Sequence, residues 1–113
     1  MTAKNTLTKA PPYAIESAIK QLGANLRTAR LRRNLTIVEV GEKIGTGPRA
    51  ISDAEHGKAT TSIAVYTALL WAYDLLSPWD ALADPAKDMV GIALSERRER
   101  ARSTSRTGLD DDF

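Results

Sequence analysis

The stretch TIVEVGEKIGTGPRAISDAEHG, residues 36–57, decides the fold. Thr36 is followed three residues later by Glu39, the pattern of a capping box, which predicts the start of a helix. Val40 and Ile44 then fall on one helical face at the spacing i, i+4. The stretch therefore begins with a short amphipathic helix.

A glycine-containing break separates this helix from a second one. Gly45-Thr46-Gly47 ends the first helix, because glycine readily adopts the positive φ angle found at helix C-termini. Pro48 suits the first turn of the next helix, whose inner face carries Ile51 and Ala54, and Gly57 ends it. Two short helices joined by a tight turn with a glycine have the layout of a helix-turn-helix.

This window resembles the Xre-type helix-turn-helix of phage repressor and Cro proteins, and the resemblance extends from about Leu22 to Leu82. The matching positions are Thr36, Val40, Gly41, Gly45, Ile51, Ser52, Glu55 and Gly57. The chain departs from the family pattern at Ile37, where a phosphate-binding Gln is common, at Gly41, usually Ala, and at Gly47, usually Ser. The resemblance implies an all-α, five-helix, lambda-repressor-like domain. It also implies a structural ion pair between Arg30 and Glu55, neither of which would then contact DNA.

Length and composition are those of one small helical domain with tails. The chain has 113 residues, of which 42% are hydrophobic, and no cysteine, which excludes disulfides and thiolate metal sites. His56 is the only histidine, and no catalytic motif or metal-ligand cluster is present, so we expect neither an enzyme nor a cofactor. No apolar run approaches the ~20 residues that span a bilayer, which favours a cytoplasmic protein.

Apolar spacing divides the chain into three zones. Residues 1–12 are expected to form a flexible arm, residues 13–83 the helix-turn-helix domain, and residues 84–113 a C-terminal helix and tail. Besides the two helices above, the spacing predicts helices over 13–34 and 61–75, a short helix from Ser77-Pro78 through Leu82, and a last helix from Asp84-Pro85. Periodicity leaves open whether Trp71, Tyr73 and Trp79 belong to the core or to an interface.

The second helix of a helix-turn-helix enters the major groove with its N-terminal residues first. Arg49 is therefore the residue placed to bind guanine O6 and N7. Asp53 can accept from a cytosine amino group or orient Arg49, and Ala50 can contact a thymine methyl. The candidate DNA-binding residues are Lys43, Gly47, Pro48, Arg49, Ala50, Ser52, Asp53, Lys58 and Thr60.

The last thirty residues lie outside the generic domain. An apolar stripe from Ala86 to Leu94 suits packing on the body or binding of a partner. The run from Arg97 to Arg106 holds five arginines and one glutamate, typical of a solvated, disordered segment, although it can also lie along DNA or an acidic partner. The acidic and apolar end is typical of a segment that orders on binding and is the candidate partner-binding site: Leu109, Asp110, Asp111, Asp112 and Phe113.

A compact Xre domain with a short tail resembles the HipB-type antitoxins. That resemblance implies a homodimeric repressor of a palindromic DNA operator, acting as the antitoxin of a HipA-like Ser/Thr kinase toxin. Two alternatives remain open: a stand-alone Xre-type regulator, and a protein-interaction module without DNA readout. Arg49, Lys43 and Lys58 near the groove-facing end favour DNA binding.

Overall fold

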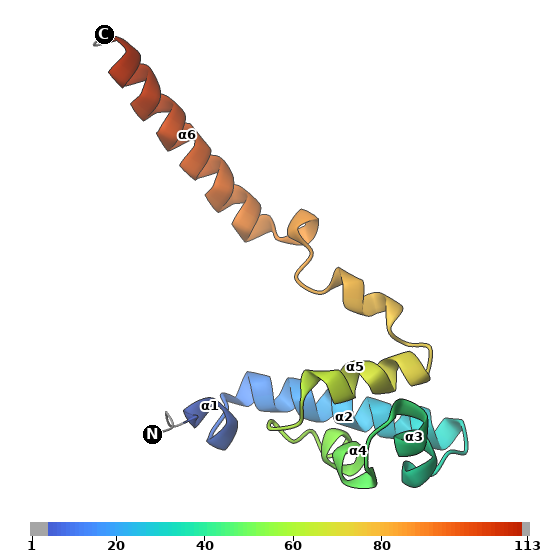
Figure 1. Ribbon diagram of the computed structural model, residues 1–113. Coiled ribbons are helices and arrows are strands. Elements are labelled where there is room, and N and C mark those ends of the chain that lie inside the picture. Colours follow the sequence, from blue (N-terminus) through green and yellow to red (C-terminus); the bar gives the residue numbers. More distant parts are fainter. Residues whose placement is uncertain (1–4, 112–113) are drawn as a thin grey trace. The chain divides into compact units, whose positions relative to one another are not determined.

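The computed structural model describes residues 5–111 and the side chains of residues 5–105. Every regular element in 5–111 is a helix and no strand occurs there, so the all-α fold class with an additional C-terminal helix is confirmed (Figure 1). The chain forms two compact units, residues 1–77 and 78–113. The elements are α1 (Thr6–Lys9), α2 (Tyr13–Arg32), α3 (Ile37–Ile44), α4 (Pro48–Glu55), α5 (Ile63–Ala72), the 3-10 helices η1 (Ser77–Ala81) and η2 (Pro85–Lys87), and α6 (Met89–Asp111).

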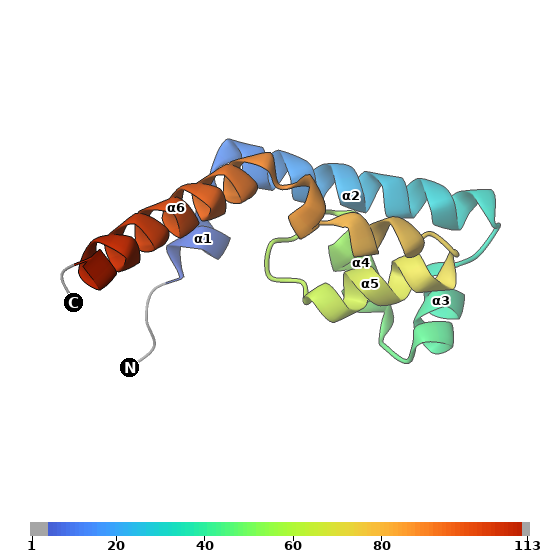
Figure 2. The same ribbon diagram turned by 90° about the horizontal axis from the view of Figure 1, so that it is seen from above.

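The first unit is built on α2, the longest helix of that unit. Its buried residues Gly23, Leu26, Ala29 and Arg30 follow helical spacing and form one face. This face packs on α4, while α3, α4 and α5 contact one another (Figures 1 and 2). The helix-turn-helix is therefore held between two flanking helices.

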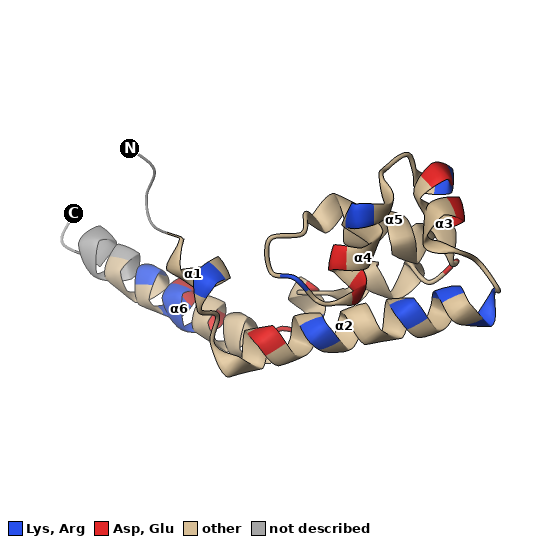
Figure 3. Cartoon of the chain, turned by 90° about the horizontal axis from the view of Figure 1, so that it is seen from below, with Lys and Arg blue, Asp and Glu red and all other residues tan. Residues whose placement is uncertain are grey.

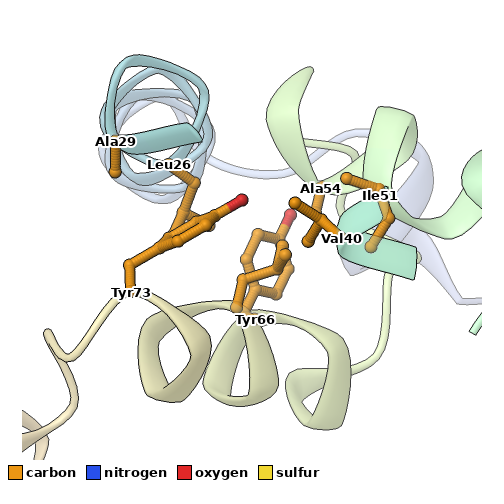
Figure 4. Close-up of a cluster of buried hydrophobic side chains, with 8 residues drawn as sticks. Leu26, Ala29, Val40, Ile51, Ala54, Tyr66 and Tyr73 are labelled. Carbon is orange, nitrogen blue, oxygen red and sulfur yellow. The ribbon is translucent and has the colours of Figure 1, made fainter. Parts of the chain in front are cut away.

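The core of this unit joins four of its helices, α2, α3, α4 and α5. Leu26, Val40, Ile51, Leu69 and Tyr73 are each less than 2% exposed. Figure 4 shows Tyr66 of α5 and Tyr73, the residue that follows α5, pointing toward residues of α2, α3 and α4. Tyr73 is thus a core residue, whereas Trp71 is 61% exposed.

Arg33 ties the C-terminal ends of α2 and α5 together. Its guanidinium donates to the Ala29 carbonyl at 2.9 Å and to the Tyr73 carbonyl at 2.8 Å, and lies 5.3 Å from the centre of the Tyr73 ring. A cation at the two helix ends also interacts favourably with both helix dipoles. Burial raises the pKa of Tyr73.

α2 and the end of α4 approach each other backbone to backbone. A Cβ atom built on Gly23 would lie 2.5 Å from the Ala54 carbonyl oxygen and 2.8 Å from that of Glu55. Just after α4, Gly57 has φ +67°, and a Cβ atom built on it would lie 2.5 Å from the Cα of Lys20 in α2. Glycine at both positions permits this close approach.

The second unit departs from the sequence-based expectations in its helix boundaries. The helix expected from Asp84-Pro85 is the single turn η2, and α6 begins at Met89. Asp88 causes the restart, because its side chain accepts from the Gly91 N–H at 2.9 Å and its carbonyl from the Ile92 N–H at 2.9 Å. The short helix predicted from Ser77-Pro78 is the 3-10 helix η1.

The expectation of disorder for 97–106 is wrong. This run lies within α6, because arginine, glutamate and alanine favour helix and Glu99 pairs with Arg102 one turn later at 3.6 Å. In the N-terminal arm, α1 was not predicted; the Asn5 side chain caps it by accepting from the Thr8 N–H at 3.2 Å.

Candidate nucleic-acid interface

The turn between α3 and α4 has the geometry expected from its sequence. At the start of α3, the Glu39 N–H donates to the Thr36 hydroxyl at 3.1 Å, and the Thr36 N–H donates to the Glu39 carboxylate at 2.8 Å. At its end, Gly45 has φ +81°, and the N–H groups of Gly45 and Thr46 both donate to the Gly41 carbonyl. The first helix of the motif is therefore capped at both ends.

Gly41 lets the turn fold back over α3. A Cβ at this position would lie 2.7 Å from the Thr46 carbonyl oxygen. Gly41 replaces the alanine of the family pattern. The replacement suits this chain because the backbone of the turn lies very close to α3 at that position.

α4 presents one face to the core and the other to solvent. Gly47 is its N-cap, without a side-chain cap, and Pro48 occupies the first turn. Ile51 and Ala54 are completely buried. Arg49 is exposed on the opposite side, while three other candidate DNA-binding residues of the helix, Ala50, Ser52 and Asp53, are half-buried.

The end of α4 is closed by a Schellman motif. The Gly57 N–H donates to the Ala54 carbonyl at 3.0 Å and the Lys58 N–H to the Asp53 carbonyl at 3.0 Å, with Gly57 in the left-handed conformation. The Tyr66 hydroxyl then donates to the Lys58 carbonyl at 3.2 Å. These bonds fix the chain that leads from α4 to α5.

Arg30 and Glu55 form a buried, two-bond ion pair between α2 and α4. Arg30 Nε donates to Glu55 Oε2 at 2.7 Å and Nη2 to Oε1 at 3.0 Å, and the side chains are 9% and 4% exposed. Arg30 Nη1 also donates to the Leu35 carbonyl at 2.9 Å. The hydrogen bond to Glu55 raises the pKa of Arg30. The pair is internal, so it fixes the position of α4 and is not accessible to DNA.

The charged candidates differ in how they are paired. Asp53 lies 3.8 Å from the Lys58 ammonium, so the structure pairs it with Lys58. Arg49 makes neither a hydrogen bond nor an ion pair with any residue in the described part of the chain. Lys43, which precedes α4 in the sequence, and Thr60, which follows it, are both exposed. Arg49 is therefore an exposed and unpaired cation at the first turn of α4.

Other basic residues are distributed over the surface. Figure 3 shows Lys and Arg spaced along α2 and clustered in α6. In α2, Arg27 and Arg32 are exposed. His56, the single histidine, donates from Nδ1 to the Ser52 carbonyl at 2.7 Å and so extends the end of α4. Among the described side chains, those of residues 5–105, no cluster of three or more metal-ligating side chains occurs.

Residues 21–83 match the model of a helix-turn-helix domain family, and the chain belongs to that family. Its helix-turn-helix supports a DNA-binding regulator, and domains of this family are typically not enzymes. No curated protein and no solved structure matches the chain. None of the helices in the described part of the chain combines the length and apolarity that crossing a bilayer requires.

Sequence reasoning missed two contacts, one joining α2 to α4 and one joining α2 to α5. The close approach at Gly23 and the clamp formed by Arg33 join residues 31 or more positions apart, which periodicity cannot pair. Glycine inside a long helix and arginine directly after it were the available signals. The tail prediction, Leu109 to Phe113, concerns side chains outside those that the structure describes.

Proposed function

We propose that the protein is a sequence-specific DNA-binding repressor that reads its operator through α4. The observation that carries this proposal is the exposed, unpaired Arg49 at the first turn of α4, on a helix whose opposite face is locked in the core. Arginine donates two parallel hydrogen bonds to guanine, the commonest specific contact in the major groove.

The remaining polar candidates have different roles in this proposal. Lys43, Lys58 and Thr60 would contact phosphates and set the register of the domain on DNA. The Asp53 carboxylate would hold Lys58 near the backbone and reduce non-specific attraction. Gly47 and Pro48 bring the N-terminus of α4 close to the groove without a bulky side chain.

Arg49→Ala tests the proposal against a matched variant, Arg27→Ala, which removes an exposed arginine from α2. An electrophoretic shift assay on the promoter of the protein's own gene should show about 5- to 150-fold weaker binding by Arg49→Ala. The Arg27→Ala variant should bind nearly as the wild type does. Equal wild-type affinity for promoter and random DNA at moderate salt would refute sequence-specific readout.

A dimer on a palindromic operator is part of the same proposal. Two domains related by a two-fold axis would place their α4 helices in successive major grooves, with half-sites about 34 Å apart. Lengthening the spacer between half-sites by five base pairs should then abolish tight binding. Unchanged affinity would show that single domains bind independently.

We further infer an antitoxin role, in which the C-terminal tail binds a HipA-like Ser/Thr kinase toxin. The support is the sequence of the tail, with Leu109 and Phe113 on either side of three carboxylates. Such a segment suits a basic cleft with an apolar pocket. A chain truncated after residue 107 should still fold and bind DNA but lose affinity for the toxin by calorimetry. Equal affinity of the truncated and untruncated chains for the toxin would show that the tail does not bind it. A kinase-like reading frame adjacent to the gene of this protein would support the antitoxin role.

A further inference from the structure

The outward face of α5 is apolar although it faces solvent. Tyr66, Leu69 and Tyr73 are buried and form part of the core, and Figure 4 shows the two tyrosines pointing inward. On the opposite side, Ile63 is 66% exposed and Trp71 is 61% exposed. At 100° per residue, Ile63, Ala64, Thr67 and Trp71 fall within one outward sector; we call these four residues the α5 face.

The single polar residue of the α5 face contributes no free polar group. The Thr67 hydroxyl donates to the Ile63 carbonyl at 2.9 Å, with the Ala64 carbonyl at 3.1 Å. Its hydrogen is thus used within the helix, and the methyl group remains for packing. A threonine bonded in this way behaves as a small apolar residue.

α5 carries no charged residue anywhere along IAVYTALLWA. A helix that is apolar on every side is normally buried on every side, whereas a surface helix has a polar face. Leu75, just beyond the helix, is also 43% exposed. The composition of α5 is therefore that of a helix covered on both faces.

We propose that the α5 face is covered by the α5 face of a second copy of this chain. A two-fold interface places the same patch on both partners, so a self-associating face must not oppose like charges. The α5 face meets this condition. The exposed side of α2 does not, because it presents Lys20, Arg27 and Arg32, and the second half of α6 presents four arginines between residues 97 and 102. The start of α6, where Met89, Val90 and Leu94 are exposed, is also uncharged, but it has no aromatic side chain comparable to Trp71.

The α5 face is large enough to form the apolar centre of such a contact. A buried aromatic side chain covers about 150–250 Å², and the exposed parts of Ile63 and Trp71, with the neighbouring Leu75, amount to roughly half of the ~800 Å² per partner of a standard interface, so residues around the face would supply the rest. Trp is also the residue type most enriched among energetically dominant contacts. This inference rests on the proposed function, in which a palindromic operator is read by two copies.

The mass of the full-length protein tests the interface. Wild type at micromolar concentration should sediment at twice the chain mass of 12.3 kDa. The double variant Ile63→Glu, Trp71→Glu should dissociate at least about 30-fold more readily. The matched control, Ile15→Glu with Tyr13→Glu, introduces the same two charges on exposed positions of α2 and should remain a dimer. A monomeric wild type, or an Ile63/Trp71 variant that stays dimeric, would overturn the proposal.

A second measurement needs no disruptive substitution. The chain has two tryptophans, so Trp79→Phe leaves Trp71 as the only one. Its emission should be blue-shifted at concentrations where the protein is a dimer and should move to the red on dilution. Red-shifted emission in a dimer would show that another surface mediates association.

The outcome for DNA is separable from the outcome for the dimer. If the chain dimerises through the α5 face but binds promoter and random DNA equally, the interface stands and the proposed repressor function fails. If the chain binds its promoter specifically as a dimer and the Ile63/Trp71 variant keeps the dimer, the function stands and this interface fails.

Discussion

Replacing Gly23 by alanine sets two physical effects against each other. On helix propensity alone, alanine within a helix is about 1 kcal/mol more favourable than glycine, so the substitution should stabilise α2. In the folded domain, however, the added Cβ would lie 2.5, 2.8 and 2.9 Å from backbone atoms of Ala54, Glu55 and Gly57. Backbone atoms cannot rotate away, so α2 and α4 must separate.

The steric effect should be the larger of the two. Overpacking a well-packed site costs about 1–3 kcal/mol, and three backbone contacts place Gly23→Ala at the upper end. Subtracting the propensity gain leaves a net loss of about 2 kcal/mol. For a domain of this size, each 1 kcal/mol lowers Tm by about 4–8 °C, so Tm should fall by about 8–16 °C.

Thermal unfolding followed by circular dichroism measures this effect. Ala24→Gly, at the exposed neighbouring position, serves as the control and should lose about 1 kcal/mol through propensity alone. A Tm for Gly23→Ala equal to or above that of the wild type would show that the close approach of α2 and α4 is not a constraint.

Two further predictions concern stability. Glu55→Ala leaves the buried Arg30 uncompensated and should cost about 3–5 kcal/mol in urea unfolding, whereas Asp53→Ala breaks an exposed pair and should cost at most about 1 kcal/mol; equal unfolding midpoints would contradict this difference. The hydrogen bond from the Thr36 backbone lowers the pKa of Glu39, so the carboxylate contributes stability above its ordinary pKa of 4.5 and loses that contribution as pH falls through the lowered value. The Tm advantage of the wild type over Glu39→Gln should therefore shrink on acidification below pH 4.5, and a difference that stays constant from pH 6 to pH 3 would be the contrary result.

Local signals in the sequence determine the helix-turn-helix closely. The capping box at Thr36, the left-handed Gly45 and the first-turn Pro48 act within one or two turns of chain, and all three occur as the sequence indicates. Their physics is local, so spacing alone is sufficient to recognise them.

The prediction failed where two local effects compete. In residues 97–106, charge density favoured disorder while the helix-forming residues favoured α6. At Asp84-Pro85, the sequence contained a good helix start, but Asp88 four residues later supplied another and α6 begins there. The tertiary roles of Gly23 and Arg33 depend on which helices lie beside them, information that no single window of sequence contains.

The eight-residue length of α4 has a consequence for how the protein loses activity. An isolated helix of this length is not stable in water, so residues 48–55 are helical only while Ile51, Ala54 and Glu55 remain in their places in the core. The surface that would read DNA and the hydrophobic core are thus a single cooperative unit. A partly unfolded domain should therefore not bind DNA even weakly through α4. Native-state hydrogen exchange of the α4 amides should occur only through global unfolding of residues 13–77.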